Sequence, residues 1–193
     1  MKKLLITGFE PFGGETTNPS WDALALVPEI VGDFELTKLE VPVVFETAAK
    51  IVIDKSQEIG AGFVLCIGQA GGRDAITPEM VGINLRYARI PDNDGNEPKD
   101  EKIFENGDDA YFTTFPARKI ADAISSKNIS SRVSYSAGAY VCNDVIYSLL
   151  YHFKDTDVKV GFIHVPYSTE QNKEPAMRLE DIATAIIAAI EAM

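Results

Sequence analysis

Hydrophobic residues along the chain fall into two alternating patterns, which predict strands and helices in turn. Short apolar runs bounded by turn-forming or polar residues are typical of buried strands, and they cover residues 3–8, 62–68 and 158–165. Residues 34–43 and 132–136 are also interpreted as strands. Apolar residues spaced at i, i+3, i+4 and i+7 predict helices starting at Asn18-Pro19 and over residues 46–59, 117–126, 142–153 and 174–192. This alternation predicts one α/β domain over residues 1–193, a three-layer α/β/α sandwich with a twisted, mostly parallel sheet.

One stretch in the middle of the chain departs from that alternation. Val81, Ile83, Leu85 and Tyr87 alternate strictly with small or polar residues, which predicts a half-buried strand over residues 81–88. Residues 90–109 are rich in Pro, Gly, Asn and Asp, which predicts a long irregular segment. Loops of such length tend to be functional or mobile.

Composition narrows the classes of protein to which the chain can belong. With 193 residues, 46% of them hydrophobic, it has enough apolar material for a large core. The 18 Lys and Arg against 29 Asp and Glu give a net charge of −11, which argues against nucleic acid and anionic membranes as partners. No run of apolar residues is long enough to predict a membrane span. The N-terminal run has neither a long apolar core nor a cleavage site, so it predicts a first strand.

The two cysteines occur in different surroundings and suggest no disulfide framework, which favours a reducing cytoplasm. Cys66 lies inside an apolar run, as an inert buried thiol would. Cys142 lies in the first turn of a predicted helix, where unpaired N–H groups and the helix dipole favour a thiolate and offer an oxyanion site. The alternative is a free cysteine that packs as a small hydrophobe.

A histidine and several carboxylates supply possible partners for such a thiol. His164 closes the last predicted strand, and in α/β folds ligands bind at the C-terminal ends of strands. A cysteine at a helix start and a histidine at a strand end are what a cysteine hydrolase needs, with a carboxylate such as Glu79 to orient the imidazole. A satisfied core histidine is the alternative for His164. His152 ends a helix and is interpreted as an ordinary terminus.

Several motifs resemble, in order and spacing, those of the pyroglutamyl peptidase type I family, also called pyrrolidone-carboxylate peptidases. The resemblance extends from Leu4 to about Gln171 and rests on these segments: 8–14, 18–21, 67–73, 78–79, 88–93, 140–143 and 162–166. It implies an enzyme that removes an N-terminal pyroglutamyl residue from peptides. Ala139 departs from the family pattern, because a threonine is common there.

The resemblance also implies roles for individual residues. Cys142, His164 and Glu79 match the catalytic triad, and Arg89 matches an arginine near the oxyanion site, to which the Cys142 N–H also belongs. Other residues match positions that line the pyroglutamate pocket: Phe9, Phe12, Gln69, Ile90, Tyr140 and Val141. The family is cytosolic, needs no metal or cofactor and is often a homo-tetramer.

Two other functions remain open on the residues alone. Glycine-rich loops at strand ends also suit a phosphorylase that binds nucleoside and phosphate, and an apolar pocket also suits a protein that holds a lactam without turning it over. Individual pocket residues have plainer interpretations too. Phe9 and Phe12 are alternatively core residues, Gln69 a backbone cap and Arg89 a surface charge.

Overall fold

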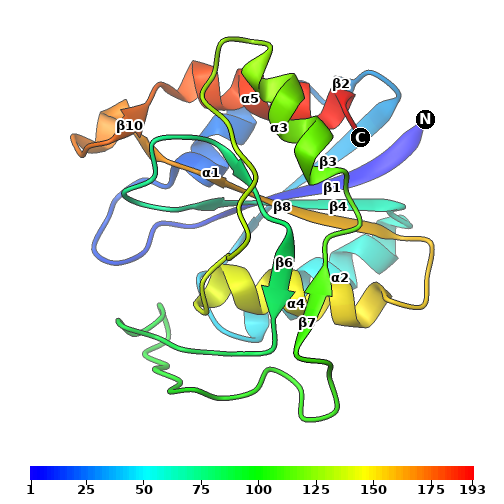
Figure 1. Cartoon of the computed structure of the whole chain (residues 1–193), viewed down its shortest axis with the longest axis vertical. Coiled ribbons are helices and arrows are strands. Elements are labelled where there is room, and N and C mark those ends of the chain that lie inside the picture. The colour runs from blue at the N-terminus through cyan, green and yellow to red at the C-terminus, as the bar shows by residue number, and fades with distance from the viewer.

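The computed structural model describes residues 1–193 and has a six-stranded sheet at its centre (Figure 1). The strand order is β2-β3-β1-β4-β8-β5. The four inner strands run parallel: β3 (Phe34–Val41), β1 (Lys2–Phe9), β4 (Phe63–Gln69) and β8 (Lys159–Val165). The short edge strands β2 (Ile30–Val31) and β5 (Thr77–Pro78) are antiparallel to their neighbours. The predicted mostly parallel sheet is confirmed.

Helices cover both faces of this sheet (Figure 1). On one face lie α1 (Pro19–Asp22), the 3₁₀ helix η1 (Ala23–Leu26), α3 (Ala117–Ser125) and α5 (Leu179–Glu191), and on the other lie α2 (Thr47–Ile59) and α4 (Val141–Phe153). Successive residues of β1 face opposite layers: Leu4 and Ile6 pack in one core, Leu5 in the other. The predicted three layers are therefore confirmed. None of the helices combines the length and apolarity needed to cross a bilayer.

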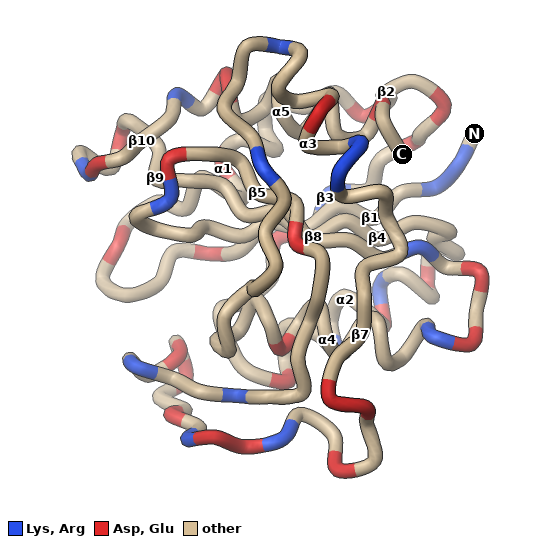
Figure 2. Tube along the Cα trace, viewed as in Figure 1, with Lys and Arg blue, Asp and Glu red and all other residues tan.

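Charged residues lie along the whole trace, with basic residues spread among acidic ones (Figure 2). The Asp and Glu residues outnumber the Lys and Arg residues, 29 to 18, which gives the net charge of −11.

The predicted strand over residues 81–88 is only partly right. β6 (Val81–Ile83) pairs with β7 (Ala110–Phe112), and no strand continues beyond Ile83. The side chain of Asn143 in α4 instead accepts the Ile83 N–H and donates to the carbonyls of Ile83 and Leu85. Because a side chain satisfies these backbone groups, a partner strand is not needed. Residues 84–109 contain no helix or named strand, as the turn-forming composition predicts.

Two further predicted elements differ from the structure. Residues 132–136 form no strand and make only an isolated bridge from Ser134 to Glu79. The C-terminal helix begins at Leu179, because the preceding residues form β10 (Ala176–Met177), which pairs with β9 (Tyr167–Ser168). Glu180 and Asp181 occupy the first turn of α5, where acidic side chains favour the helix dipole.

Candidate active site

The predicted nucleophile, Cys142, lies in the first turn of α4, at the edge of the sheet where the parallel strands end. Val141 is the first residue of α4 and Cys142 the second, and Tyr140 precedes them in an extended conformation. No side chain caps this helix end, so the N–H groups of its first turn are available to a ligand. The helix start thus leaves backbone N–H groups beside the thiol, where the sequence predicts an oxyanion site.

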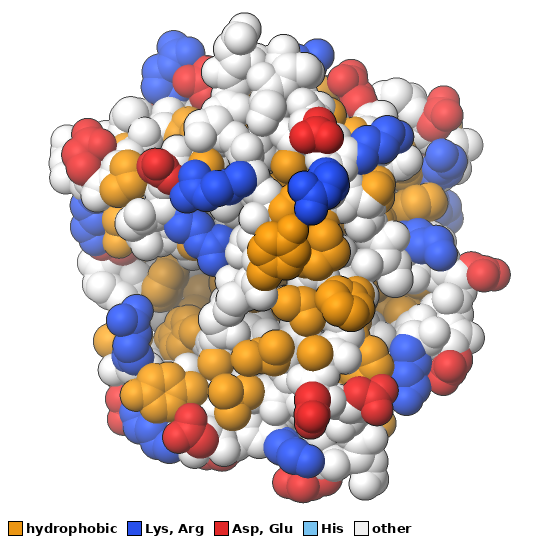
Figure 3. All heavy atoms as spheres, in the orientation of Figure 1, with side chains coloured by type: hydrophobic (Ala, Val, Ile, Leu, Met, Phe, Trp, Pro, Cys, Tyr) orange, Lys and Arg blue, Asp and Glu red, His pale blue; other side chains and the backbone are white.

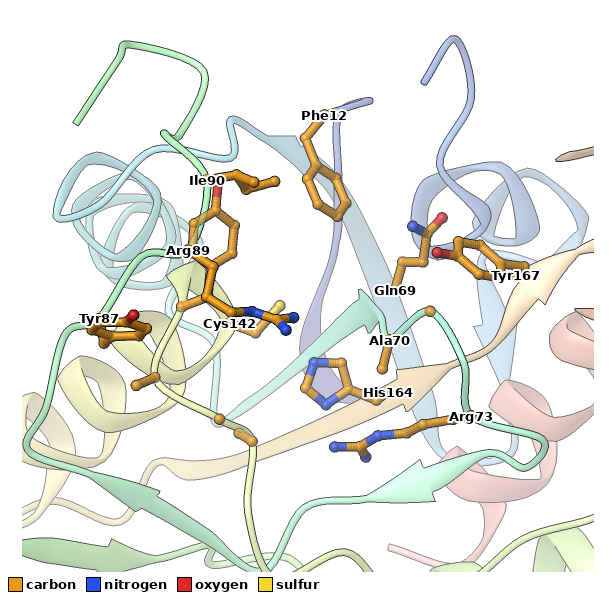
Figure 4. A pocket seen from close by; sticks show the side chains of 15 residues that line it. Phe12, Gln69, Ala70, Arg73, Tyr87, Arg89, Ile90, Cys142, His164 and Tyr167 are labelled. Atoms are coloured by element: carbon orange, nitrogen blue, oxygen red, sulfur yellow. The ribbon is translucent and has the colours of Figure 1, made fainter. Parts of the chain in front are cut away.

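The sulfur of Cys142 rests directly on strand β4. A Cβ atom added to Gly68 would lie 2.9 Å from Cys142 Sγ and 2.8 Å from the ring of Phe162. Gly68 pairs in register with His164 on β8. The thiol and the imidazole therefore sit over neighbouring strands, and Figure 4 shows both side chains facing the same pocket.

A buried carboxylate holds the imidazole. His164 Nδ1 lies 2.7 Å from Glu79 Oε1, and both side chains are almost completely buried. Glu79 is fixed in turn by its own N–H, which donates to the Phe162 carbonyl at 2.9 Å. An ionised carboxylate only accepts hydrogen bonds, so Nδ1 carries the proton and Nε2 is the free base. The predicted carboxylate and histidine are adjacent.

Arg73 completes this arrangement and is not among the predicted site residues. Its Nη1 donates to the same Glu79 oxygen at 2.7 Å, and its Nη2 donates to the Ser136 carbonyl at 3.1 Å. The other carboxylate oxygen of Glu79 is buried without a partner. The sequence signal for Arg73 is its place after two glycines in the loop that follows β4. That position shows that Arg73 follows a strand end, but it does not reveal that Arg73 contacts Glu79.

The surroundings set the protonation of the histidine and its carboxylate. Burial alone would raise the pKa of Glu79, but the hydrogen bond and charge of His164, together with Arg73, outweigh it and lower this pKa. Burial lowers the pKa of His164 below its usual value, against the opposing effect of Glu79. Near neutral pH the pair is a carboxylate and a neutral imidazole.

The pKa of the Cys142 thiol differs from the expectation. Desolvation by the surrounding protein raises the pKa of Cys142 to about 12, and the negative charge of Glu79 adds to this rise. Burial thus opposes the easier ionisation of the thiol that the helix start is expected to give. The resting site pairs a neutral thiol with a neutral imidazole.

A pocket of about 500 Å³ opens over the thiol. Predicted residues that line it are Phe12, Gln69, Arg89, Ile90, Tyr140, Cys142 and His164. A small recess of about 30 Å³ continues beneath, and there the buried Phe9 and Val141 join the wall. The structure thus brings together the residues that the sequence places in the pocket. Figure 4 shows the exposed Arg89 reaching with its guanidinium toward Cys142 and His164.

Aromatic contacts hold the wall of the pocket in place. Tyr140 packs edge-on against Phe45, with ring centroids 5.3 Å apart, and lies 6.3 Å from Phe12. Its hydroxyl donates to the Pro91 carbonyl at 3.0 Å. Tyr87 and Tyr167 also line the pocket and are not predicted. Nothing in their sequence surroundings distinguishes them from ordinary surface tyrosines.

No three His, Cys, Asp or Glu residues lie together as metal ligands would. A thiol, an imidazole and a carboxylate gathered at the C-terminal edge of a parallel sheet define the class of cysteine peptidases on an α/β fold. Within that class, the chain belongs to the pyroglutamyl peptidase family, whose family model matches residues 2–193.

Relatives of known name cover nearly the whole chain. Pyrrolidone-carboxylate peptidases from Staphylococcus saprophyticus and Thermosipho africanus are each 44% identical over 99% of this chain, and the match covers 92% and 96% of their lengths. Among solved structures, pyroglutamyl peptidase I from Bacillus amyloliquefaciens has a TM-score of 0.95 at 42% identity, covering 100% of this chain and 97% of its own. Pyrrolidone carboxyl peptidase from Thermococcus litoralis also has a TM-score of 0.95, at 38% identity, covering 100% and 93%. These likenesses support neither a phosphorylase nor a non-catalytic lactam-binding protein.

Proposed function

We propose that this protein hydrolyses the bond after an N-terminal pyroglutamyl residue of peptides, with Cys142 as nucleophile, His164 as general base and Glu79 as the group that orients it. The observation that carries the proposal is the buried 2.7 Å contact between His164 and Glu79 beside a thiol packed on Gly68. Membership of the pyroglutamyl peptidase family supports the substrate class.

The first half of the reaction forms a thioester. Nε2 of His164 takes the proton of the Cys142 thiol as the sulfur attacks the carbonyl that joins pyroglutamate to the next residue. The carbonyl oxygen becomes an oxyanion, which the N–H of Cys142 and the guanidinium of Arg89 stabilise. The C–N bond then breaks, and the imidazolium returns its proton to the leaving amine.

The second half releases pyroglutamate. His164 takes a proton from a water molecule, which attacks the thioester carbonyl. The C–S bond then breaks, and the imidazolium returns its proton to the sulfur, which regenerates the neutral thiol. Glu79 remains ionised throughout and stabilises the imidazolium in both halves. Arg73 holds the Glu79 carboxylate in place through their 2.7 Å contact.

The pocket chemistry suits a neutral ring. Phe9, Phe12, Tyr140 and Val141 form apolar walls around the recess beside Cys142, and Ile90 lines the wider pocket above it. A pyroglutamyl ring is a lactam whose nitrogen is an amide and stays uncharged. The recess offers no carboxylate to pair with a cation, so it favours a lactam over a protonated amine.

We further propose that the chain acts as one catalytic domain in a cytoplasmic homo-oligomer, a tetramer as in the family it resembles. Two free cysteines fit a reducing compartment. Phe112 and Tyr135 are 73% and 63% exposed, and hydrophobic side chains gather over β6 and β7 in Figure 3. An apolar patch of this kind favours contact with a second copy.

Hydrolysis of a chromogenic pyroglutamyl amide tests the proposed activity. We expect turnover by the wild-type protein, loss of turnover on treatment with a thiol alkylator, and loss in Cys142→Ser. The matched control is Cys66→Ser, because Cys66 is fully buried and its pKa is raised to about 12 by burial. An inactive but folded Cys66→Ser beside an active Cys142→Ser would overturn the choice of nucleophile.

A further inference from the structure

Two successive hydrogen bonds lead from the backbone of β9 to the substrate pocket through two glutamine side chains. The Ser168 N–H donates to Gln171 Oε1 at 3.0 Å, and Gln171 Nε2 donates to Gln69 Oε1 at 2.9 Å. Gln171 lies outside the pocket lining, at the end of the 3₁₀ helix η2 (Thr169–Gln171), whereas Gln69 lines the pocket.

The direction of these bonds is fixed by groups whose roles cannot reverse. A backbone N–H only donates, so the end of the Gln171 amide that faces Ser168 must be its oxygen. The other end faces Glu15 Oε2 at 3.4 Å as well as Gln69. The hydrogen bond from Lys173 lowers the pKa of Glu15, so this carboxylate is ionised and only accepts. Both ends of the Gln171 amide are therefore assigned by their neighbours.

The same reasoning assigns the oxygen and the nitrogen of the Gln69 amide. Gln171 presents an N–H toward it, so the nearer atom of the Gln69 amide must be the oxygen. The nitrogen is left on the other side, and Figure 4 shows it on the side of Phe12 rather than of Tyr167. Within the protein the side chain of Gln69 is bonded through Oε1 only. The pocket is thereby given a donor of fixed orientation.

We infer that Gln171 is a specificity-determining positioning residue, which holds the Gln69 amide so that its N–H₂ group donates to the ring carbonyl of a lactam. The inference rests on the proposed function, since it names how the same pocket recognises its ring. Gln69 lines the recess together with Phe9, Phe12 and Cys142, so its donor lies beside the ring that the apolar walls enclose. A ring without that carbonyl leaves the donor unpaired, which costs affinity.

The test uses one substitution to reverse the direction of the hydrogen bond between residue 171 and Gln69. In Gln171→Glu, one carboxylate oxygen still accepts the Ser168 N–H, but the other now demands a donor from Gln69. The Gln69 amide then turns over and presents its oxygen to the pocket. Asn172→Asp is the matched control, because it adds the same charge at the next residue, which makes no hydrogen bond to Gln69.

The readout is protection of Cys142 against iodoacetamide by two neutral ligands. Pyroglutamide carries the lactam carbonyl, and cyclopentanecarboxamide has a ring of the same size without it. In Gln171→Glu we expect protection by pyroglutamide to weaken roughly 30- to 100-fold, within the range of about 5- to 150-fold for a buried polar group left unpaired. Protection by cyclopentanecarboxamide should change less than about threefold, and Asn172→Asp should leave both unchanged. A second variant, Gln171→Met, frees the amide without adding charge and should weaken pyroglutamide protection by about tenfold.

Two results would overturn the inference. Equal weakening of both ligands would show that Gln171 only supports the fold of the pocket, and unchanged protection by pyroglutamide in both Gln171 variants would show that it does not set the donor. Hydrolysis of a pyroglutamyl amide by the wild-type protein separates this inference from the proposed function. If the proposed function is wrong, the wild-type protein does not hydrolyse that amide at all.

Discussion

At the scale of single residues, the site is arranged so that both reacting groups start uncharged. Burial lowers the pKa of His164 and raises that of Cys142 to about 12, so the imidazole is free to take the thiol proton at neutral pH. The identity of the two side chains follows from their places at a strand end and a helix start. The protonation states of these two side chains cannot be predicted in the same way, because they depend on burial, which the sequence does not reveal.

The pH dependence of kcat/KM follows from this neutral pair. His164 must be unprotonated, and its pKa lies below the usual 6.5, so activity is lost only as pH falls below about 6.5. It should then stay level from neutral pH to about pH 9, because no imidazolium is needed in the free enzyme. A fall in kcat/KM between neutrality and about pH 9 would instead indicate a preformed thiolate–imidazolium pair.

Arg73→Gln should move the acidic limb of the profile of kcat/KM against pH to higher pH. The guanidinium charge disfavours a second cation on His164 and so lowers its pKa. Without that charge the pKa of His164 rises, and activity is lost at a higher pH on acidification. Arg132→Gln is the control, because Arg132 pairs with the exposed Asp74 and does not contact Glu79. An acidic limb that stays in place or moves to lower pH would contradict this role of Arg73.

Glu79→Gln tests the orienting carboxylate. The substitution keeps the size of the side chain but removes the charge that stabilises the imidazolium, so kcat should fall by roughly 10³ or more with KM little changed. His152→Ala provides the comparison, because His152 is exposed and contacts only Gln57 among polar side chains. Unchanged kcat with a raised KM would place Glu79 in substrate binding instead.

At the scale of elements, the close approach of α4 to strand β4 creates the site. That approach depends on Gly68, where a methyl group would overlap both Cys142 Sγ and Phe162. The sequence predicts the strand and the helix correctly but gives no sign of the contact, since glycine before Gln69 is also an ordinary strand end. The wrongly predicted strand at 132–136 has a similar cause, because an apolar alternation does not tell whether an adjacent strand is present to pair with it.

Gly68→Ala is expected to displace the thiol. Because misplacement of a reacting atom by about 1 Å costs on the order of 10² in rate, kcat/KM should fall by about that factor or more. Overpacking should also destabilise the fold by about 1–3 kcal/mol. Gly62→Ala is the matched control at the start of the same strand, where nothing lies within 4 Å of the added methyl group. Equal activity of the two variants would show that Gly68 does not position Cys142.

At the scale of the whole molecule, the sheet gathers residues from four distant parts of the chain. Phe9 ends β1, Gln69 ends β4, Cys142 lies in the first turn of α4 and His164 lies near the end of β8. This gathering could be predicted, because the C-terminal ends of parallel strands share one edge. Which side chains touch there could not be predicted, so the sequence gives no role in the site to Arg73, Gln171 or the tyrosines of the pocket.

The central claim is a cysteine peptidase whose pocket selects an uncharged lactam, and side-by-side kinetics of two amides test it most directly. N-terminal proline has nearly the same ring but carries a protonated nitrogen, which costs several kcal/mol to bury without a partner, of which aromatic faces return about 1–2 kcal/mol. Proline also lacks the ring carbonyl. We predict that kcat/KM for a pyroglutamyl amide exceeds that for the prolyl amide by at least ~10³. A prolyl amide hydrolysed within about tenfold of its pyroglutamyl counterpart would contradict the account.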